Sequence, residues 1–140
     1  MILNEIGKRS VLTARPTDPL ADVTRKMKKE NVGAVVVTED ERVVGIVTDR
    51  DLALALGLGE ATIATPVSEI MTREVKTIWE DQGVFNATQY FQGHQLRRLP
   101  VVDRHDKLVG MITLDDLFGL LTRELYNCAQ SLEPALGEKV

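Results

Sequence analysis

The chain has 140 residues, a common size for one compact domain, and its 44% hydrophobic and 27% charged residues are typical of a globular fold. The net charge of −4 argues against nucleic acid or a membrane surface as the primary partner, because such binders usually present a basic face. The one cysteine, Cys128, excludes an internal disulfide, and the lack of a signal-peptide pattern or a long apolar run predicts a cytoplasmic protein. Cys128 and the two histidines, His94 and His105, have no metal-ligand spacing, so no metal site is expected.

The first half of the chain predicts five elements. They are a strand at 11–13, a helix from Pro19, strands at 34–37 and 43–47, and a helix from 49–52. Pro19 suits the first turn of a helix, where its missing N–H costs little. Leu20, Val23 and Met27 recur at i, i+3 and i+7, which places them on one helical face.

The second half predicts the same elements in the same order. They are a strand at 75–78, a helix carrying Val84, Ala87 and Phe91, strands at 99–102 and 108–112, and a helix from 114–117. The apolar residues of its first helix repeat the spacing found in the first half. Each half therefore reads β-α-β-β-α.

The two halves are one repeated unit. A shift of 64 residues places 4–11 on 68–75, and after one inserted residue a shift of 65 places 43–52 on 108–117. A unit of about 55–60 residues buries only a marginal core by itself, so we expect the two units to pack face to face in a mixed α+β fold. We predict the first unit at 2–56, a linker at 57–66, the second unit at 67–122, and a helical tail at 123–140.

Each unit carries a Thr-x-x-Asp sequence where its last strand turns into its last helix. Thr48-x-x-Asp51 and Thr113-x-x-Asp116 have the form of a capping box, in which each side chain bonds the other residue's backbone N–H. The same geometry suits a ligand, because a helix N-terminus favours an anion and a carboxylate there can accept ribose hydroxyls. The sequence leaves both interpretations open.

These features together resemble the tandem CBS-domain pair, named after cystathionine beta-synthase. The resemblance covers residues 2–122, and the segments that carry it are 67–72, 32–52 and 96–117. It rests on both copies of the unit being in register. It implies a pseudo-twofold pair of units, dimers that form a flat disk, and clefts between units that bind adenosine-containing ligands. In that family the Thr-x-x-Asp sequence is a nucleotide signature with Asp on the ribose, which carries over to the two sequences quoted above.

The resemblance also implies cations for a ligand phosphate. In some family members, two basic residues before the strand contact phosphates of a ligand held by the other unit's Asp. Arg97 and Arg98 match these positions and would face Thr48 and Asp51. The alternative is that both arginines are solvated charges at the entry of a strand.

The two sites are predicted to be unequal. Gly33 and Ala34 stand where the second unit has its arginine pair, so they cannot neutralise a phosphate near Thr113. Arg50 is a further phosphate candidate, but its counterpart is the acidic Asp115. We therefore expect the site of Thr48 to be the better one for a phosphorylated ligand.

The resemblance implies that adenine lies between two strands of a unit. The candidates for this base slot are Thr13, Ala14, Pro16 and Val35 in the first unit, and Thr77, Ile78 and Leu99 in the second. For Val35 and Leu99, packing in the core is the alternative. Trp79, the one tryptophan, can stack on a base or fill an interface.

The function implied is a non-catalytic regulatory sensor. Its regulatory ligand would be AMP, ADP, ATP, NAD or S-adenosylmethionine, it would need no catalytic cofactor, and it would act as a homodimer on a regulated protein partner. The alternative is a structural or protein-interaction module for dimerisation, with degenerate ligand sites. An enzyme is not expected, because the sequence offers no nucleophile–base set and Cys128 has no histidine near it.

Overall fold

The computed structural model describes residues 10–94 and 96–137 and contains two units of the same architecture. The first unit comprises strand β1 (Thr13–Ala14), helix α2 (Leu20–Glu30), strands β2 (Ala34–Glu39) and β3 (Arg42–Thr48), and helix α3 (Asp49–Gly57). The short 3-10 helix η1 (Val67–Glu69) follows, and its Val67 belongs to the core of the first unit. The second unit comprises β4 (Ile78–Trp79), α4 (Val84–His94), β5 (Arg98–Val102), β6 (Leu108–Thr113) and α5 (Leu114–Gly137). The predicted β-α-β-β-α order is confirmed in both halves.

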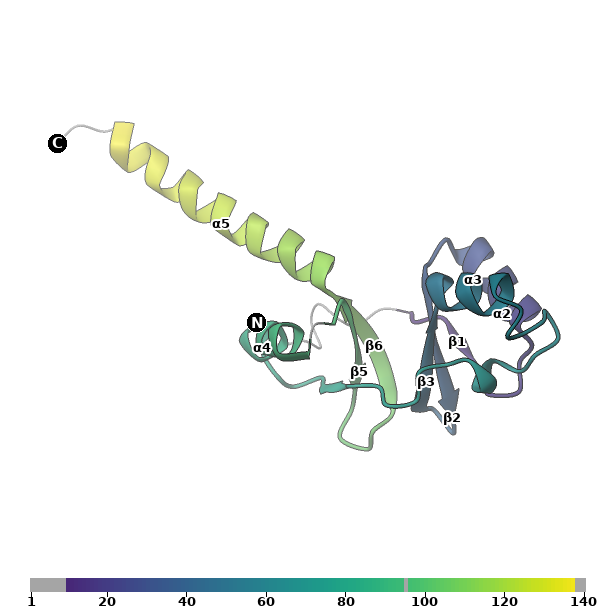
Figure 1. Ribbon diagram of the computed structural model, residues 1–140. Coiled ribbons are helices and arrows are strands. Elements are labelled where there is room, and N and C mark those ends of the chain that lie inside the picture. Colours follow the sequence, from purple (N-terminus) through teal and green to yellow (C-terminus); the bar gives the residue numbers. More distant parts are fainter. Residues whose placement is uncertain (1–9, 95, 138–140) are drawn as a thin grey trace.

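Each unit forms a three-stranded sheet, in the order β1-β2-β3 or β4-β5-β6. The two sheets lie next to each other in the middle of the molecule, with α2 and α3 outside the first sheet and α4 outside the second (Figure 1). This arrangement confirms the predicted mixed α+β pair. Among the described residues, no helix combines the length and apolar character needed to cross a bilayer.

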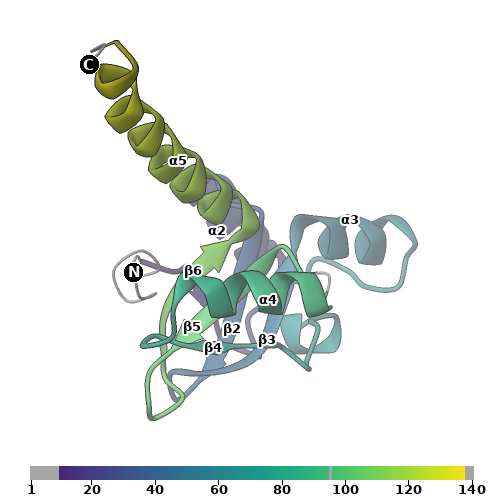
Figure 2. The same cartoon turned by 90° about the vertical axis from the view of Figure 1, so that its left-hand side faces the viewer.

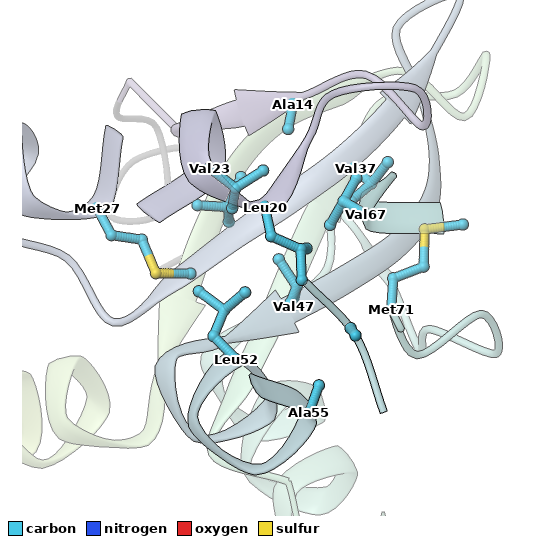
Figure 3. Close-up of a cluster of buried hydrophobic side chains, with 12 residues drawn as sticks. Ala14, Leu20, Val23, Met27, Val37, Val47, Leu52, Ala55, Val67 and Met71 are labelled. Atoms are coloured by element: carbon cyan, nitrogen blue, oxygen red, sulfur yellow. The ribbon is translucent and has the colours of Figure 1, made fainter. Parts of the chain in front are cut away.

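The core of the first unit lies between its sheet and its helices. Leu20, Val23 and Met27 of α2 point into this cluster together with Val37 and Val47 from the sheet (Figure 3). The predicted apolar face of α2 is thus buried. Ala87 and Phe91 of α4 occupy the equivalent positions in the core of the second unit.

The apolar runs of β2 and β5 are covered on both faces. Val35 belongs to the helix-side core, whereas Val36 is fully buried but lies outside that cluster. In the second unit, Leu99 belongs to the helix-side core, whereas Pro100 is buried but lies outside that cluster. Because successive strand residues point to opposite faces, Val36 and Pro100 lie on the side between the units.

The first strands differ slightly from the predicted 11–13 and 75–78, and proline explains the difference between the units. In the first unit, Val36 N–H donates to the Leu12 carbonyl at 3.1 Å, next to the short parallel strand pair. Pro100 stands at the position of Val36 and has no N–H to donate, so β4 pairs only from Ile78 onward. The antiparallel pairs are otherwise alike, with a register shift after Val37 and after Val101.

Backbone contacts join the units. Ile46 in β3 and Thr72, which follows η1, exchange two backbone hydrogen bonds of 3.0 and 2.9 Å. The Leu108 N–H donates to the Glu41 carbonyl at 2.9 Å, and Lys107 Nζ lies 3.2 Å from a Glu41 carboxylate oxygen. These contacts fix how the two sheets face each other, and with them the space between the units.

Candidate functional site

Both Thr-x-x-Asp turns form the predicted capping box. At the start of α3, Thr48 N–H donates to Asp51 Oδ2 at 2.9 Å and Asp51 N–H donates to Thr48 Oγ1 at 3.2 Å. At the start of α5, both equivalent bonds between Thr113 and Asp116 measure 3.0 Å. The capping interpretation is thus confirmed for both units. A ligand role for these four residues stays a prediction.

A cavity of about 270 Å³ lies between the units. The first unit contributes Ser10, Val11, Leu12, Val32, Gly33 and Ala34, and the second contributes Arg98, Met111 and Thr113. Thr48 and Asp51 are not among these lining residues. The cavity combines an apolar wall from the first unit with a hydroxyl and a guanidinium from the second, which is the usual composition of a small-molecule site.

Strand pairing places Arg98 in this cavity. Arg98 lies opposite Thr113 in the β5–β6 pair, as Ala34 lies opposite Thr48 in the first unit. Its guanidinium reaches toward the other unit: a Cβ built on Gly33 would lie 3.5 Å from Arg98 Nη2 and 3.2 Å from Asp49 Oδ2. Arg98 therefore lies beside the N-terminus of α3 while also lining the cavity at Thr113.

Arg97 is placed differently from Arg98. Its Nη2 lies 4.0 Å from Asp115 Oδ1, and both side chains are more than 70% exposed. Arg97, Arg98, Thr113 and Asp115 line a smaller hollow of about 80 Å³. The acidic Asp115, which the sequence marks as the counterpart of Arg50, thus lies among the cations of the second unit. The predicted phosphate role of Arg50, which is exposed at the start of α3, stays untested.

The residues predicted for the base slot are mostly packed in the cores. Ala14, Val35, Ile78 and Leu99 are at most 3% exposed and belong to the two hydrophobic clusters. The remaining candidates, Thr13, Pro16 and Thr77, are partly buried and do not line the cavity. Their role toward a base remains a prediction.

The sequence reasoning did not select the apolar residues that line the cavity. Val11 and Leu12 precede β1, and Ala34 stands one position before the predicted Val35. The alternation of side chains along a strand could have indicated Ala34, because Ala34 and Val35 are neighbours in β2 and therefore lie on opposite faces of the sheet. The repeat was a second signal, since Ala34 stands at the position of Arg98.

Trp79 lies away from the cavity. It is 46% exposed, and the guanidinium carbon of Arg104 lies 5.0 Å from its ring centroid. Arg104 also pairs with Asp81. Within the described part of the chain, no group of three His, Cys, Asp or Glu residues is placed to hold a metal.

Comparison with known proteins agrees with this architecture. The CBS domain family matches residues 3–58 and again residues 67–123. The MK0525 protein of Methanopyrus kandleri is 33% identical over 117 residues, which are 82% of this chain and 60% of that protein. The CBS domain-containing protein YhcV of Bacillus subtilis is 38% identical over 107 residues, or 76% of each chain.

A solved structure has the same fold. The crystal structure of the CBS domain pair of MJ0100, in complex with 5′-methylthioadenosine and S-adenosyl-L-methionine, superposes with a TM-score of 0.78. The two chains are 26% identical, and the match covers 89% of this chain and 98% of the other.

Proposed function

Because the chain belongs to the CBS-domain family and carries two copies of that domain, we propose that it is a non-catalytic regulatory module that binds an adenosine-containing ligand between its units. The observation that carries the proposal is the cavity of about 270 Å³, to which both units contribute walls. A ligand in such a place bridges the units, so binding can be transmitted to their relative arrangement.

The lining of the cavity suggests a role for each side. Val11, Leu12 and Val32 offer apolar surface to a base. Thr113 lines the cavity and offers a hydroxyl. Its capping partner Asp116 is not among the lining residues, and its carboxylate is the predicted contact for ribose hydroxyls. Arg98 supplies the cation for a phosphate or for a carboxylate such as that of S-adenosylmethionine.

The ligand candidates remain AMP, ADP, ATP, NAD and S-adenosylmethionine. The complex of MJ0100 with two adenosine derivatives supports this class. The site at Thr48 and Asp51, which the sequence predicts to be the better one for a phosphorylated ligand, stays part of the proposal. Arg98 and Asp49 both lie close to Gly33, so Arg98 is also near the start of α3. Arg97 and Arg50 are proposed as outer contacts for a phosphate. The predicted unit boundaries, the homodimer, the regulated partner and the cytoplasmic location belong to the same proposal.

Thermal unfolding with each ligand tests the proposal. A ligand present at 100 times its Kd stabilises the folded chain by about 2.7 kcal/mol, which raises the melting temperature measurably. If adenosine, AMP, ATP, NAD, 5′-methylthioadenosine and S-adenosylmethionine all leave the melting temperature unchanged, the ligand proposal fails. The alternative, a structural or interaction module with degenerate sites, then takes its place.

Titration calorimetry with variants assigns the site. Arg98→Gln should weaken AMP about 10-fold or more, because a charge-assisted hydrogen bond contributes about 1.5–3 kcal/mol, while adenosine should bind as before. Arg25→Gln is the matched control, since Arg25 is exposed on α2 and pairs with Asp22, and neither residue lines the cavity. Equal losses for AMP and adenosine in Arg98→Gln would contradict the proposed role of Arg98.

A further inference from the structure

Helix α5 leaves the body of the protein and extends away from it (Figures 1 and 2). Its 24 residues span about 36 Å at 1.5 Å per residue. Its start is anchored: Leu117 is 1% exposed, Leu114 packs against the core of the second unit, and Leu120 is partly buried. From residue 121 to residue 132 every side chain is exposed.

The exposed part of α5 carries an apolar seam with a heptad spacing. The seam residues follow one another at intervals of three, four, three and four, and they are Phe118, Leu121, Leu125, Cys128 and Leu132. The four large side chains of the seam are 46–72% exposed, and Cys128 is exposed as well. A repeat of 3.5 residues keeps one stripe facing a partner helix that has the same repeat.

We propose that this seam packs against the same seam of a second copy of the chain, as a short two-stranded coiled coil. Seams with this spacing are self-complementary, because each apolar side chain can insert between those of an identical helix. Partner choice in coiled coils is set by charges on the positions that flank the seam. In α5 these positions are 122, 124, 129 and 131. Only Glu124 is charged among these four, so the flanks carry no pattern that opposes pairing of identical helices.

The size of the seam predicts a reversible dimer. Covering an apolar side chain of this kind removes roughly 60–120 Å² from water, so the five seam residues supply about 300–600 Å² per copy. A standard stable interface buries about 800 Å² per partner. We therefore expect dimers that dissociate on dilution in the micromolar range. The inference names a surface for the proposed homodimer and does not depend on the ligand.

Sedimentation velocity of the full chain between 1 and 100 μM tests the seam. The wild-type chain should shift from monomer to dimer over this range, and Leu125→Glu should weaken association at least 100-fold. Tyr126→Glu is the matched control, because Tyr126 is 61% exposed, adjacent in the chain and off the seam. It should change the dimer affinity less than threefold. A wild-type chain that stays monomeric at 100 μM, or a Leu125→Glu chain that still dimerises, overturns the proposal.

The thiol of Cys128 gives a second measurement that needs no variant. For a dissociation constant of about 1–10 μM, the rate constant for its reaction with an aromatic disulfide reagent should be about 4- to 7-fold smaller at 100 μM protein than at 1 μM, because the dimer covers the seam and the monomer reacts. An equal rate at both concentrations overturns the proposal. AMP binding by Leu125→Glu and Tyr126→Glu should equal that of the wild type, since no seam residue lines the cavity. Failure of the seam and failure of the ligand site can thus be told apart.

Discussion

A close contact between a glycine and a methionine gives a sharp test of how the units are joined. Gly45 lies in β3, and Met71 comes from the segment between η1 and β4 that leads into the second unit. A Cβ on Gly45 would lie 2.3 Å from Met71 Sδ, 2.7 Å from its Cγ and 3.1 Å from its Cε. The first two distances are impossible for a real side chain, so Gly45→Ala forces Met71 to move.

The cost follows from the burial of Met71. This side chain is 8% exposed and belongs to the core of the first unit, so it has little room to turn away. Overpacking of this kind costs about 1–3 kcal/mol. At roughly 3–4 °C per kcal/mol for a chain of this size, the melting temperature should fall by about 3–12 °C. When Met71 moves, we also expect the two backbone hydrogen bonds between Ile46 and the nearby Thr72 to weaken.

Thermal unfolding followed by circular dichroism measures the effect in a double-mutant cycle. Met71→Ala alone should cost about 2–5 kcal/mol, because it leaves a cavity. In Gly45→Ala with Met71→Ala the clash is absent, so the combined loss should be at least about 1 kcal/mol smaller than the sum of the single losses. Gly57→Ala is the control, since nothing lies within 4 Å of its Cβ. Strictly additive losses, or a Gly45→Ala chain as stable as Gly57→Ala, would refute the packing argument.

Two further predictions concern the turns. Thr48→Ala removes the acceptor for Asp51 N–H and should lower the free energy of unfolding by about 1 kcal/mol in urea titrations, whereas Thr48→Ser should retain most of it. Equal stability of Thr48→Ala and the wild type would contradict the capping role. Backbone hydrogen bonds from Lys107 and His105 lower the pKa of Asp103 below its usual 3.8, so its carboxylate stabilises the folded chain above about pH 4, and this contribution is lost as the pH falls through the lowered pKa. The stability difference between the wild type and Asp103→Ala should therefore shrink between pH 5 and pH 2, and a constant difference would contradict this assignment.

The repeat and the local chemistry of the chain were sufficient for the order of the elements and for both capping boxes. The spacing of Leu20, Val23 and Met27 determines a helical face, and a Thr three residues before an Asp at a strand end determines a helix start. These are local properties, since each depends on residues within two turns of one another. The sequence also determined the face-to-face pairing, because neither unit can bury enough surface alone.

Only the tertiary structure decided where the cavity lies and what lines it. An apolar run such as that of β2 does not show which residue faces the helices, so Val35 and Ala34 could be told apart only once the sheet had two covered faces. The reach of Arg98 toward Gly33 and Asp49 depends on the packing of one unit against the other, which no local pattern encodes. The same holds for the contact of Gly45 with Met71 and for the exposed seam of α5, because burial is a property of the whole chain and not of a segment.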